Sequence, residues 1–286
     1  MFFDCRRPYY DGPHCGGACL NGVRLRAHAK INTLLKVGAR RPDGYHNVRT
    51  ILQAVDLHDI VELSRSDKLS LTCSDPRLSG ESNLAWKALR LLAELFEPPP
   101  VEIHIEKSIP LASGLGGGSS DAAAVLRGVD VLLGGTVPGP DLLAVAAATG
   151  VDVPFFVSGF CHAEGTGRGD IVSELPPVKQ HAVLAMPKLG CASGDAYSRL
   201  DALEKSHAHA QNDFELVAPV ESLNLISFLT DQGAREASLT GSGSAVFAFT
   251  GSAAEACKIA ESAREQGNWA VATHTLERLE EPQWIA

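Results

Sequence analysis

Pro110-Leu111-Ala112-Ser113-Gly114-Leu115-Gly116-Gly117-Gly118-Ser119-Ser120 is the most informative stretch of this sequence. Four glycines fall between positions 114 and 118, and a backbone without Cβ atoms can turn tightly and approach a ligand closely. Two serines follow, where we expect a helix over residues 121–133 to begin. Free N–H groups and the positive end of the helix dipole would converge there and favour an anion. The stretch predicts a phosphate-binding loop, although a mobile surface loop could have the same composition.

The flanking sequence separates this loop from two better-known phosphate loops. A P-loop needs a lysine directly after its last glycine, and no lysine occurs from residue 111 to residue 177. A dinucleotide-binding fingerprint needs an apolar parallel strand before the loop. Residues 101–106 instead alternate between apolar and polar side chains, which indicates a strand with one buried face. The local order is strand, glycine loop and helix.

Composition limits the classes of protein. The chain has 286 residues, which allows one large or two modest domains. Its net charge of −9 gives no general attraction to nucleic acid or to an anionic membrane, and we expect neither as a partner. No run approaches the roughly 20 apolar residues of a membrane-spanning helix. Seven cysteines, an odd number and mostly isolated, suit a reducing compartment, so we expect a cytoplasmic location.

Periodicity elsewhere indicates both strands and helices. Residues 23–32 alternate strictly, which predicts a strand with Lys30 and Asn32 on the same side. A turn is expected at residues 41–44, where proline and glycine supply the required backbone angles. Apolar side chains then predict extended structure over residues 48–63, and Ser82 or Asn83 can cap a helix that Pro98 to Pro100 end.

The second half of the chain continues in the same mixed pattern. Strands are predicted at residues 181–186, 245–249 and 269–273, and a helix at residues 253–265. Strands and helices without strict alternation predict an α+β fold. Pro176-Pro177 is the most plausible joint between two halves. We therefore predict a flexible leader over residues 1–22, an N-terminal domain over 23–177 and a C-terminal domain over 178–286.

Lys30 and Asp152 are the candidates for chemistry near the loop. Asp152 stands in an apolar stretch, Gly150 to Phe156, and a carboxylate there is costly to bury unless it is paired. A pair with Lys30 would keep both groups ionised beside a transferring phosphoryl group. Taken singly, Lys30 could equally be a solvated strand lysine and Asp152 a turn or helix-cap residue.

Several motifs stand together in an order that resembles the GHMP kinase superfamily. They are Ala29-Lys30-Ile31-Asn32, Gly44-Tyr45-His46, the loop from Pro110 to Ser120, Asp152-Val153-Pro154 and Gly241-Ser242-Gly243. The resemblance spans about residues 24–273. It is closest to the members whose alcohol acceptor carries a cytidine diphosphate, in the non-mevalonate route to isoprenoid precursors. It implies a two-domain fold, with a ribosomal protein S5 domain 2-like N-terminal domain and a ferredoxin-like C-terminal domain.

The resemblance also implies an ATP-dependent phosphotransferase that uses magnesium and a small-molecule substrate. Lys30 and Asp152 would be the catalytic pair. The residues that would bind ATP are Asn83, Leu84, Lys107, Pro110, Ser113, Gly114, Leu115, Gly116, Gly117, Gly118, Ser119 and Ser120, with Ser120 also a magnesium ligand. Those that would bind the acceptor are Asn32, Tyr45, His46 and Tyr197. Tyr45 would stack on the cytosine and His46 would address its edge. We expect a monomer or a weak homodimer.

Some features leave alternatives open. Many members of the family carry an aromatic residue where this chain has Leu52, which would leave the cytidine clamp to Tyr45 and Tyr197. The turn at Gly241-Ser242-Gly243 could face a ligand or only connect to a strand. A GHMP kinase for mevalonate, homoserine or a sugar is the alternative enzyme, and a non-catalytic nucleotide-binding relative is the alternative outside enzymes.

Overall fold

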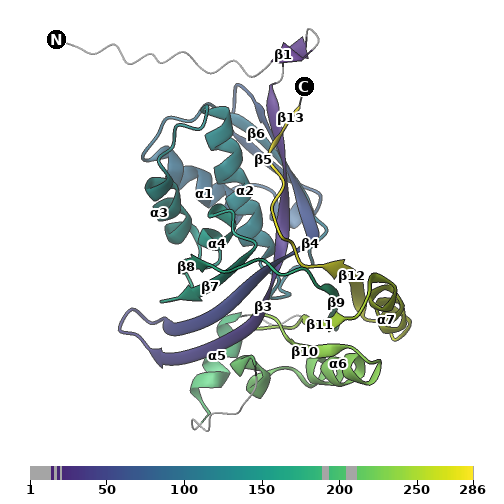
Figure 1. Cartoon of the computed structure of the whole chain (residues 1–286). Coiled ribbons are helices and arrows are strands. Elements are labelled where there is room, and N and C mark those ends of the chain that lie inside the picture. The colour runs from purple at the N-terminus through teal and green to yellow at the C-terminus, as the bar shows by residue number, and fades with distance from the viewer. Residues whose placement is uncertain (1–13, 16–17, 20, 189–192, 204–210, 286) are drawn as a thin grey trace, which may run out of the picture.

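This computed structural model describes residues 14–15, 18–19, 21–188, 193–203 and 211–285. The predicted leader over residues 1–22 therefore lies largely outside the described residues. Within it, the short strands β1 (His14–Cys15) and β2 (Ala18–Cys19) pair antiparallel. The rest of the described chain forms two sheets with helices packed on them, as Figure 1 shows. The α+β class predicted from the sequence is confirmed.

A long antiparallel hairpin forms the centre of the first sheet. Its two strands are β3 (Gly22–Arg40) and β4 (His46–Arg65). The strand predicted over residues 23–32 is thus longer than expected, because pairing with β4 continues to the predicted turn at residues 41–44. The other strands are β5 (Ser70–Cys73), β6 (Val101–Glu106), β7 (His162–Thr166), β8 (Ile171–Glu174) and β13 (Gln283–Ile285). The sheet order is β13-β3-β4-β6-β5, with β7 on β4 and β8 on β7.

Helices cover one side of this sheet, as Figure 1 shows. They are α1 (Leu84–Ala93), α2 (Gly117–Leu132), α3 (Gly139–Thr149) and α4 (Val153–Val157), with a 3-10 turn at Pro76–Leu78. The helix after the glycine loop begins at Gly117, four residues before the predicted start. Gly116 takes a left-handed φ of 75° and turns the chain into the helix there. Ser119 and Ser120 therefore lie in the first turn of α2.

The second sheet has the order β10-β11-β9-β12, and all its neighbours are antiparallel. Its strands are β9 (His181–Met186), β10 (Arg235–Leu239), β11 (Val246–Thr250) and β12 (Trp269–His274). The helices of this part are α5 (Ser193–Asp201), α6 (Val220–Asp231) and α7 (Ala253–Glu265), with a 3-10 turn at Asp213–Val217. The predictions of β9 and α7 are confirmed at the residues expected. Strand β13 returns to the first sheet although it falls within the predicted C-terminal domain, and the boundary at residue 177 stays a prediction.

A shared core joins the two sheets and fixes the face that Lys30 presents. Ala29 and Ile31 of β3 pack in one buried cluster with Leu184 of β9 and Phe247 of β11. Because side chains alternate along a strand, Lys30 lies on the opposite face, toward the glycine loop. A Cβ at Gly116 would come within 3.0 Å of the Lys30 side chain. The second sheet on one face and the glycine loop on the other therefore bury this part of β3.

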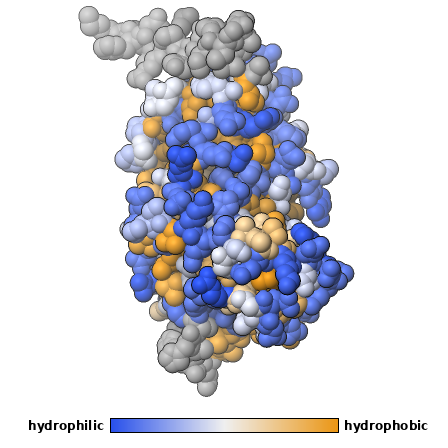
Figure 2. All heavy atoms as spheres, turned by 45° about the vertical axis from the view of Figure 1, so that its right-hand side comes forward, coloured by the Kyte–Doolittle hydropathy of each residue, from blue (hydrophilic) through white to orange (hydrophobic). Residues whose placement is uncertain are grey.

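The lengths of the helices and the polarity of the surface bear on contact with a lipid bilayer and with water. No helix in the described part of the chain is long and apolar enough to cross a lipid bilayer. On the face in Figure 2, hydrophobic side chains form separate patches among hydrophilic ones, which is ordinary for a surface in contact with water.

Candidate active site

A cleft of about 870 Å³ brings most of the predicted site residues together. It is bordered by β3, β4, the glycine loop, α5 and the turn after β10. The predicted residues that line it are Lys30, Asn32, Tyr45, His46, Leu84, Lys107, Pro110, Ser113, Gly114, Gly116, Gly117, Gly118, Ser119, Asp152 and Tyr197. Residues drawn from six separate stretches of sequence thus face one cavity.

The glycine loop opens the N-terminus of α2 toward this cleft. Gly116 caps the helix without any side-chain hydrogen bond, and the first intrahelical bond runs from the Ser120 N–H to the Gly116 carbonyl at 2.9 Å. The N–H groups of Gly117, Gly118 and Ser119 precede that bond and have no partner within the helix. Such N–H groups, together with the helix dipole, attract an anion. The predicted phosphate-type loop therefore has the local structure that its sequence indicated.

Gly114 leaves no room for a side chain. It has a φ of 82°, and a Cβ there would collide with the Thr240 carbonyl oxygen and lie 3.1 Å from the Gly243 carbonyl oxygen. Gly118 makes a matched control, because a Cβ there meets nothing within 4 Å and the residue has no positive φ. We expect Gly114→Ala to lower the free energy of unfolding by about 1–3 kcal/mol. Gly118→Ala should leave it unchanged or raise it slightly, since alanine favours helix.

Urea denaturation of the two glycine variants and the parent protein measures this difference. Equal midpoints for Gly114→Ala and Gly118→Ala would show that the loop can move away from the Thr240 turn, contrary to the packing described.

Lys30 and Asp152 face each other in the cleft. The Lys30 ammonium lies 3.6 Å from the Asp152 carboxylate and donates a 2.6 Å hydrogen bond to the Asn32 side-chain oxygen. Lys30 is only 3% exposed, so it is not the solvated strand lysine that the sequence also allowed. Asp152 occupies the N-cap position of α4 without a side-chain hydrogen bond to the helix, and 34% of its side chain is exposed. A buried cation is therefore paired with a carboxylate that ligands in the cleft can reach.

Asn32 holds this arrangement in place through internal bonds. Its side-chain nitrogen donates to the Thr50 hydroxyl at 2.7 Å, and its oxygen accepts from the Gly241 N–H at 2.8 Å as well as from Lys30. Gly241 and Ser242 themselves line the cleft. The Gly241-Ser242-Gly243 turn thus leads into β11 and also borders the cavity. Its position is compatible both with contact to a ligand and with a purely connecting role.

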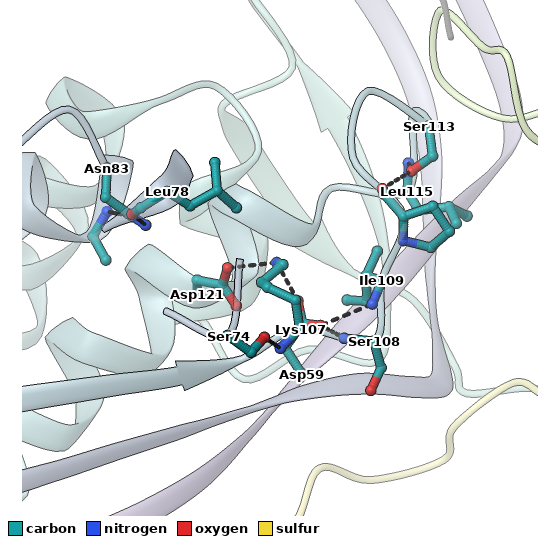
Figure 3. Close-up of polar contacts among 12 residues, drawn as sticks. Asp59, Ser74, Leu78, Asn83, Lys107, Ser108, Ile109, Ser113, Leu115 and Asp121 are labelled. Carbon is teal, nitrogen blue, oxygen red and sulfur yellow. Dashed lines mark hydrogen bonds and ion pairs between the residues drawn. The ribbon is translucent and has the colours of Figure 1, made fainter. Parts of the chain in front are cut away.

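Lys107 directly follows β6 and lies between two buried carboxylates, as Figure 3 shows. Its ammonium donates to Asp59 at 2.5 Å and to Asp121 at 2.7 Å. The other oxygen of Asp59 accepts the backbone N–H groups of Ser108 and Ile109, at 2.5 and 2.8 Å. Asp59 therefore fixes both Lys107 and the chain that enters the glycine loop. Lys107 is among the residues predicted from the sequence, whereas its two partners, 48 and 14 residues away, belong to no sequence motif.

This cluster carries one positive charge and two carboxylates away from water. Burial lowers the pKa of Lys107, but the charges of Asp121 and Asp59 outweigh it and hold that pKa above its usual value. Burial raises the pKa of Asp121 to about 7, against the opposing charge of Lys107. One Asp121 oxygen has no hydrogen-bond partner. Near neutral pH the single charge of Lys107 thus compensates poorly for a negative charge on Asp121 in addition to the one on Asp59.

The raised pKa of Asp121 predicts a dependence of stability on pH. An acid whose pKa is higher in the folded state is stabilised while it is protonated, and that contribution is lost as the pH rises from about 4 through about 7. Asp121→Asn removes the titration. The stability of the parent protein relative to Asp121→Asn should fall over this range, by at most about 1.4 kcal/mol per pH unit. Urea unfolding of both proteins at about pH 5 and about pH 8 measures this change. A stability difference between parent and Asp121→Asn that does not depend on pH would contradict the prediction.

Aromatic side chains form the end of the cleft that lies near the turn between β3 and β4. Tyr45 is 48% exposed, and the Arg168 guanidinium lies 5.0 Å from its ring centroid. The His46 ring stacks on Tyr197 at a centroid distance of 5.1 Å and 15°, and its Nε2 lies 2.8 Å from an Asp201 oxygen. Burial, and secondarily the charge of Asp152, raises the pKa of the Tyr197 hydroxyl to about 12.

Two side chains of this aromatic end were missed by the sequence analysis. Arg168 and Asp201 both line the cleft. Arg168 follows a glycine in the β7–β8 turn and Asp201 ends α5. Neither belongs to a motif that the sequence analysis singled out, so only the folded chain reveals them.

Three predicted ATP ligands do not line the cleft. Asn83 caps α1, accepting from the Ala85 N–H at 2.9 Å and donating to the Leu78 carbonyl at 2.8 Å, away from the glycine loop in Figure 3. Leu115 is fully buried, and its carbonyl accepts the Lys30 N–H at 2.9 Å. Ser120, the predicted magnesium ligand, is buried and borders a separate small cavity, whereas Ser119 borders the cleft.

Leu52 also lies outside the cleft. It is buried in the core of the first sheet, where Ala54 and Ala163 belong to the same cluster. Its side chain does not reach the cavity, whereas Tyr45 and Tyr197 line it, so a cytidine clamp formed by these two tyrosines stays a prediction.

Comparisons with known proteins give the family. Residues 83–160 match the GHMP kinases N terminal domain. A curated relative from Clostridium tetani is named 4-diphosphocytidyl-2-C-methyl-D-erythritol kinase. It is 35% identical over 259 residues, which cover 79% of this chain and 90% of the relative. This chain belongs to that kinase family. A relative of the same name from Exiguobacterium sibiricum is 37% identical over 255 residues, covering 80% of this chain and 89% of its own.

A solved structure agrees with this family. The crystal structure of a 4-(cytidine 5'-diphospho)-2C-methyl-D-erythritol kinase superposes with a TM-score of 0.75 at 30% identity, covering 88% of this chain and 98% of that one. The two-domain GHMP kinase fold predicted from the motifs is thereby confirmed. The roles of individual residues in the family's chemistry follow as proposals.

Proposed function

We propose that this chain transfers the γ-phosphoryl group of ATP to the 2-hydroxyl of 4-diphosphocytidyl-2-C-methyl-D-erythritol. The reaction belongs to the non-mevalonate route to isoprenoid precursors, and a cytoplasmic location suits it. The observation that carries the proposal is the Lys30–Asp152 pair, which faces the open N-terminus of α2 inside one cleft. A phosphoryl donor and an acceptor hydroxyl can meet at that point.

The donor would lie along the glycine loop. The unpaired N–H groups at the start of α2 suit the phosphates, and Leu84 with Leu78 offers an apolar wall to a base. The Lys107 ammonium is held by two carboxylates, so we assign only its aliphatic stem to the adenine side. Asn83 would act indirectly, by fixing the start of α1.

The acceptor hydroxyl would approach Asp152. Attack of its oxygen on the γ-phosphorus forms one P–O bond and breaks the bond to ADP, and the hydroxyl proton passes to the Asp152 carboxylate. Lys30, desolvated beside it, stabilises the negative charge that develops on the transferred oxygens. Asn32 keeps the Lys30 ammonium on this side of the cleft.

Magnesium fits the oxygen donors at this end of the cleft. The Ser119 hydroxyl and the partly exposed Asp152 carboxylate are hard oxygen ligands, which Mg²⁺ prefers together with phosphate oxygens. Bound magnesium would neutralise charge on the triphosphate. We assign Ser119 to it in place of Ser120.

Tyr45 and His46 would hold the cytidine end of the acceptor. An exposed ring at the cleft wall offers a platform for a flat base, and base–aromatic stacking contributes about 1–3 kcal/mol per base. His46 is oriented by Tyr197 and Asp201, so its ring is fixed before the ligand arrives. Asp201 is thus proposed as a positioning residue for His46.

Tyr45→Ala should weaken acceptor binding selectively. Loss of the stacking platform predicts a rise in KM for the cytidyl acceptor of roughly 5- to 150-fold, with KM for ATP within about twofold of the parent value. Tyr45→Phe keeps the ring and serves as the control, with a KM near the parent value. Steady-state kinetics with each substrate varied in turn measures both constants. A rise in KM for ATP alone would reverse the assignment of the two ends of the cleft.

The product of the reaction tests the proposed function. Phosphorus NMR of a reaction with ATP and the cytidyl acceptor should show a new phosphomonoester while the diphosphate linkage remains intact. Cleavage of the diphosphate, or no phosphomonoester, would contradict the proposal.

A further inference from the structure

A group of metal-type ligands lies outside the cleft, on the hairpin that carries Lys30. Among the described residues, His28, Asp56 and His58 each place one ligand atom within 4.8 Å of the other two. None of the three lines the large cleft. His28 is distant in sequence from Asp56 and His58, and the proposed kinase reaction makes no use of the three residues.

A β-bulge brings these side chains together. His28 of β3 pairs with His58 of β4, whereas the next residue, Ala29, pairs with Val55. Asp56 and Leu57 are therefore extra residues in β4. A bulge turns side chains out of the regular alternation, and here it sets Asp56 and His58 beside His28.

His28 is the most unusual member of the group. It is 4% exposed, and neither of its ring nitrogens makes a hydrogen bond. A buried polar group left unsatisfied is unfavourable, which makes an unpartnered histidine rare in a core. The His58 ring lies edge-on to it at a centroid distance of 5.2 Å. A ligand between the two rings would satisfy His28.

The ring nitrogens are prepared for coordination. A histidine ligates through a ring nitrogen that carries no proton, and both ring nitrogens of His28 are free of hydrogen bonds. Nδ1 of His58 lies 2.6 Å from the Asp56 backbone oxygen, so an N–H there donates to that carbonyl and leaves the lone pair on Nε2. A ligating histidine commonly donates its other ring N–H to a carbonyl in this way.

We propose that His28, Asp56 and His58 bind one divalent transition-metal ion, with Zn²⁺ as the best fit. Two imidazoles and one carboxylate suit borderline ions, whereas magnesium prefers an all-oxygen shell. The side chains of Asp56 and His58 are 42% and 24% exposed, which gives an ion access and leaves a position for water. Tetrahedral zinc bonds of about 2.0–2.2 Å hold ligand atoms about 3.4 Å apart, so atoms up to 4.8 Å apart must close by about 1.4 Å. The two partly exposed side chains allow this movement.

The surrounding charges tolerate this ion. Arg26 is the cation whose field reaches His28, and its guanidinium is paired with Glu280 at 2.7 Å. Asp56 supplies one negative charge within the ligand set. A bound ion would tie β3 to β4 two residues before Lys30, and so stabilise the hairpin from outside the cleft.

Metal titration of the full-length protein tests the site. After removal of adventitious ions with a chelator, Zn²⁺ is titrated in competition with a chromogenic chelator, and one tight equivalent is expected. His58→Ala and Asp56→Ala each remove one partly exposed ligand and should weaken that equivalent at least about tenfold. The control is His104→Ala, an exposed histidine of β6 outside the group, which should bind as the parent does. Zinc should also raise the melting temperature of the parent but not of His58→Ala.

Cobalt distinguishes this site from the cysteines of the chain. Co²⁺ in the proposed site should give visible d–d bands without the intense ultraviolet band of a thiolate ligand. Absence of a stoichiometric site, a thiolate band from that equivalent, or unchanged affinity in both His58→Ala and Asp56→Ala would overturn the proposal.

Discussion

Asp152→Asn should lower kcat by about 10²–10⁴-fold, the contribution of a positioned general base, while ATP and the acceptor still bind. The carboxylate lies 3.6 Å from a lysine that is almost fully buried, and the amide has the same shape but cannot take the hydroxyl proton. Rapid-quench or steady-state kinetics gives kcat, and calorimetry gives the two affinities. The effect should fall on turnover because the glycine loop and the aromatic end of the cleft are untouched.

Asp141→Asn is the matched control for this change. Asp141 is an exposed carboxylate in the first turn of α3 and does not line the cleft. Its variant should turn over at the parent rate. Combining Asp152→Asn with Lys30→Met should be less damaging than the product of the single effects, because both residues act on one transfer step. A kcat for Asp152→Asn within about threefold of the parent would remove Asp152 from the mechanism.

Lys107→Met should lower the free energy of unfolding by about 3–5 kcal/mol, the usual loss when a buried charge is left without its partner. The substitution removes the one cation between Asp59 and Asp121, both of which are almost fully buried. Urea unfolding measures the change. Lys258→Met, on the exposed face of α7, should stay within about 0.5 kcal/mol of the parent.

A second variant separates charge from packing at Lys107. Adding Asp121→Asn to Lys107→Met removes one of the two unpaired carboxylates and should restore part of the lost stability. The same instability in the single and double variants would mean that packing of the lysine stem, rather than its charge, holds this end of β6.

The sequence predicted the site best where local chemistry determines structure. The glycines before α2 and the alternation up to Lys30 act through backbone freedom and side-chain period, which need no distant partner. The start of α2 was placed too late because a left-handed Gly116 can open a helix without any polar cap. The apolar stretch around Asp152 indicated that it needs a partner, and the motif resemblance supplied its catalytic role beside Lys30 as well as the candidate Tyr197.

The sequence did not predict which of the site side chains face the cleft and which are buried. Ser119 and Ser120 are identical neighbours, and only the rotation of α2 over the sheet decides that one borders the cleft and the other does not. The side-chain amide of Asn83 could bind a ligand, but in the structure it caps α1. Asp59 sits inside an extended strand, and its partners Lys107 and Ser108 come from the segment after β6, so no local pattern marks it.

The phosphate loop and the catalytic pair are parts of one packed unit. Gly114 rests on the turn after β10, that turn is bonded to Asn32, and Asn32 holds Lys30. The two sheets therefore meet at the point where donor and acceptor would meet. The cleft consequently depends on both halves of the chain.

A coupled assay of ADP release tests the identity of the acceptor most directly. The purified protein is given ATP and magnesium with 4-diphosphocytidyl-2-C-methyl-D-erythritol, mevalonate, homoserine or galactose in turn. Stacking on Tyr45 and the fixed His46 ring predict turnover with the cytidyl acceptor and a kcat/KM at least about a hundredfold lower with each of the others. Equal or faster ADP release with mevalonate, homoserine or galactose would contradict the account.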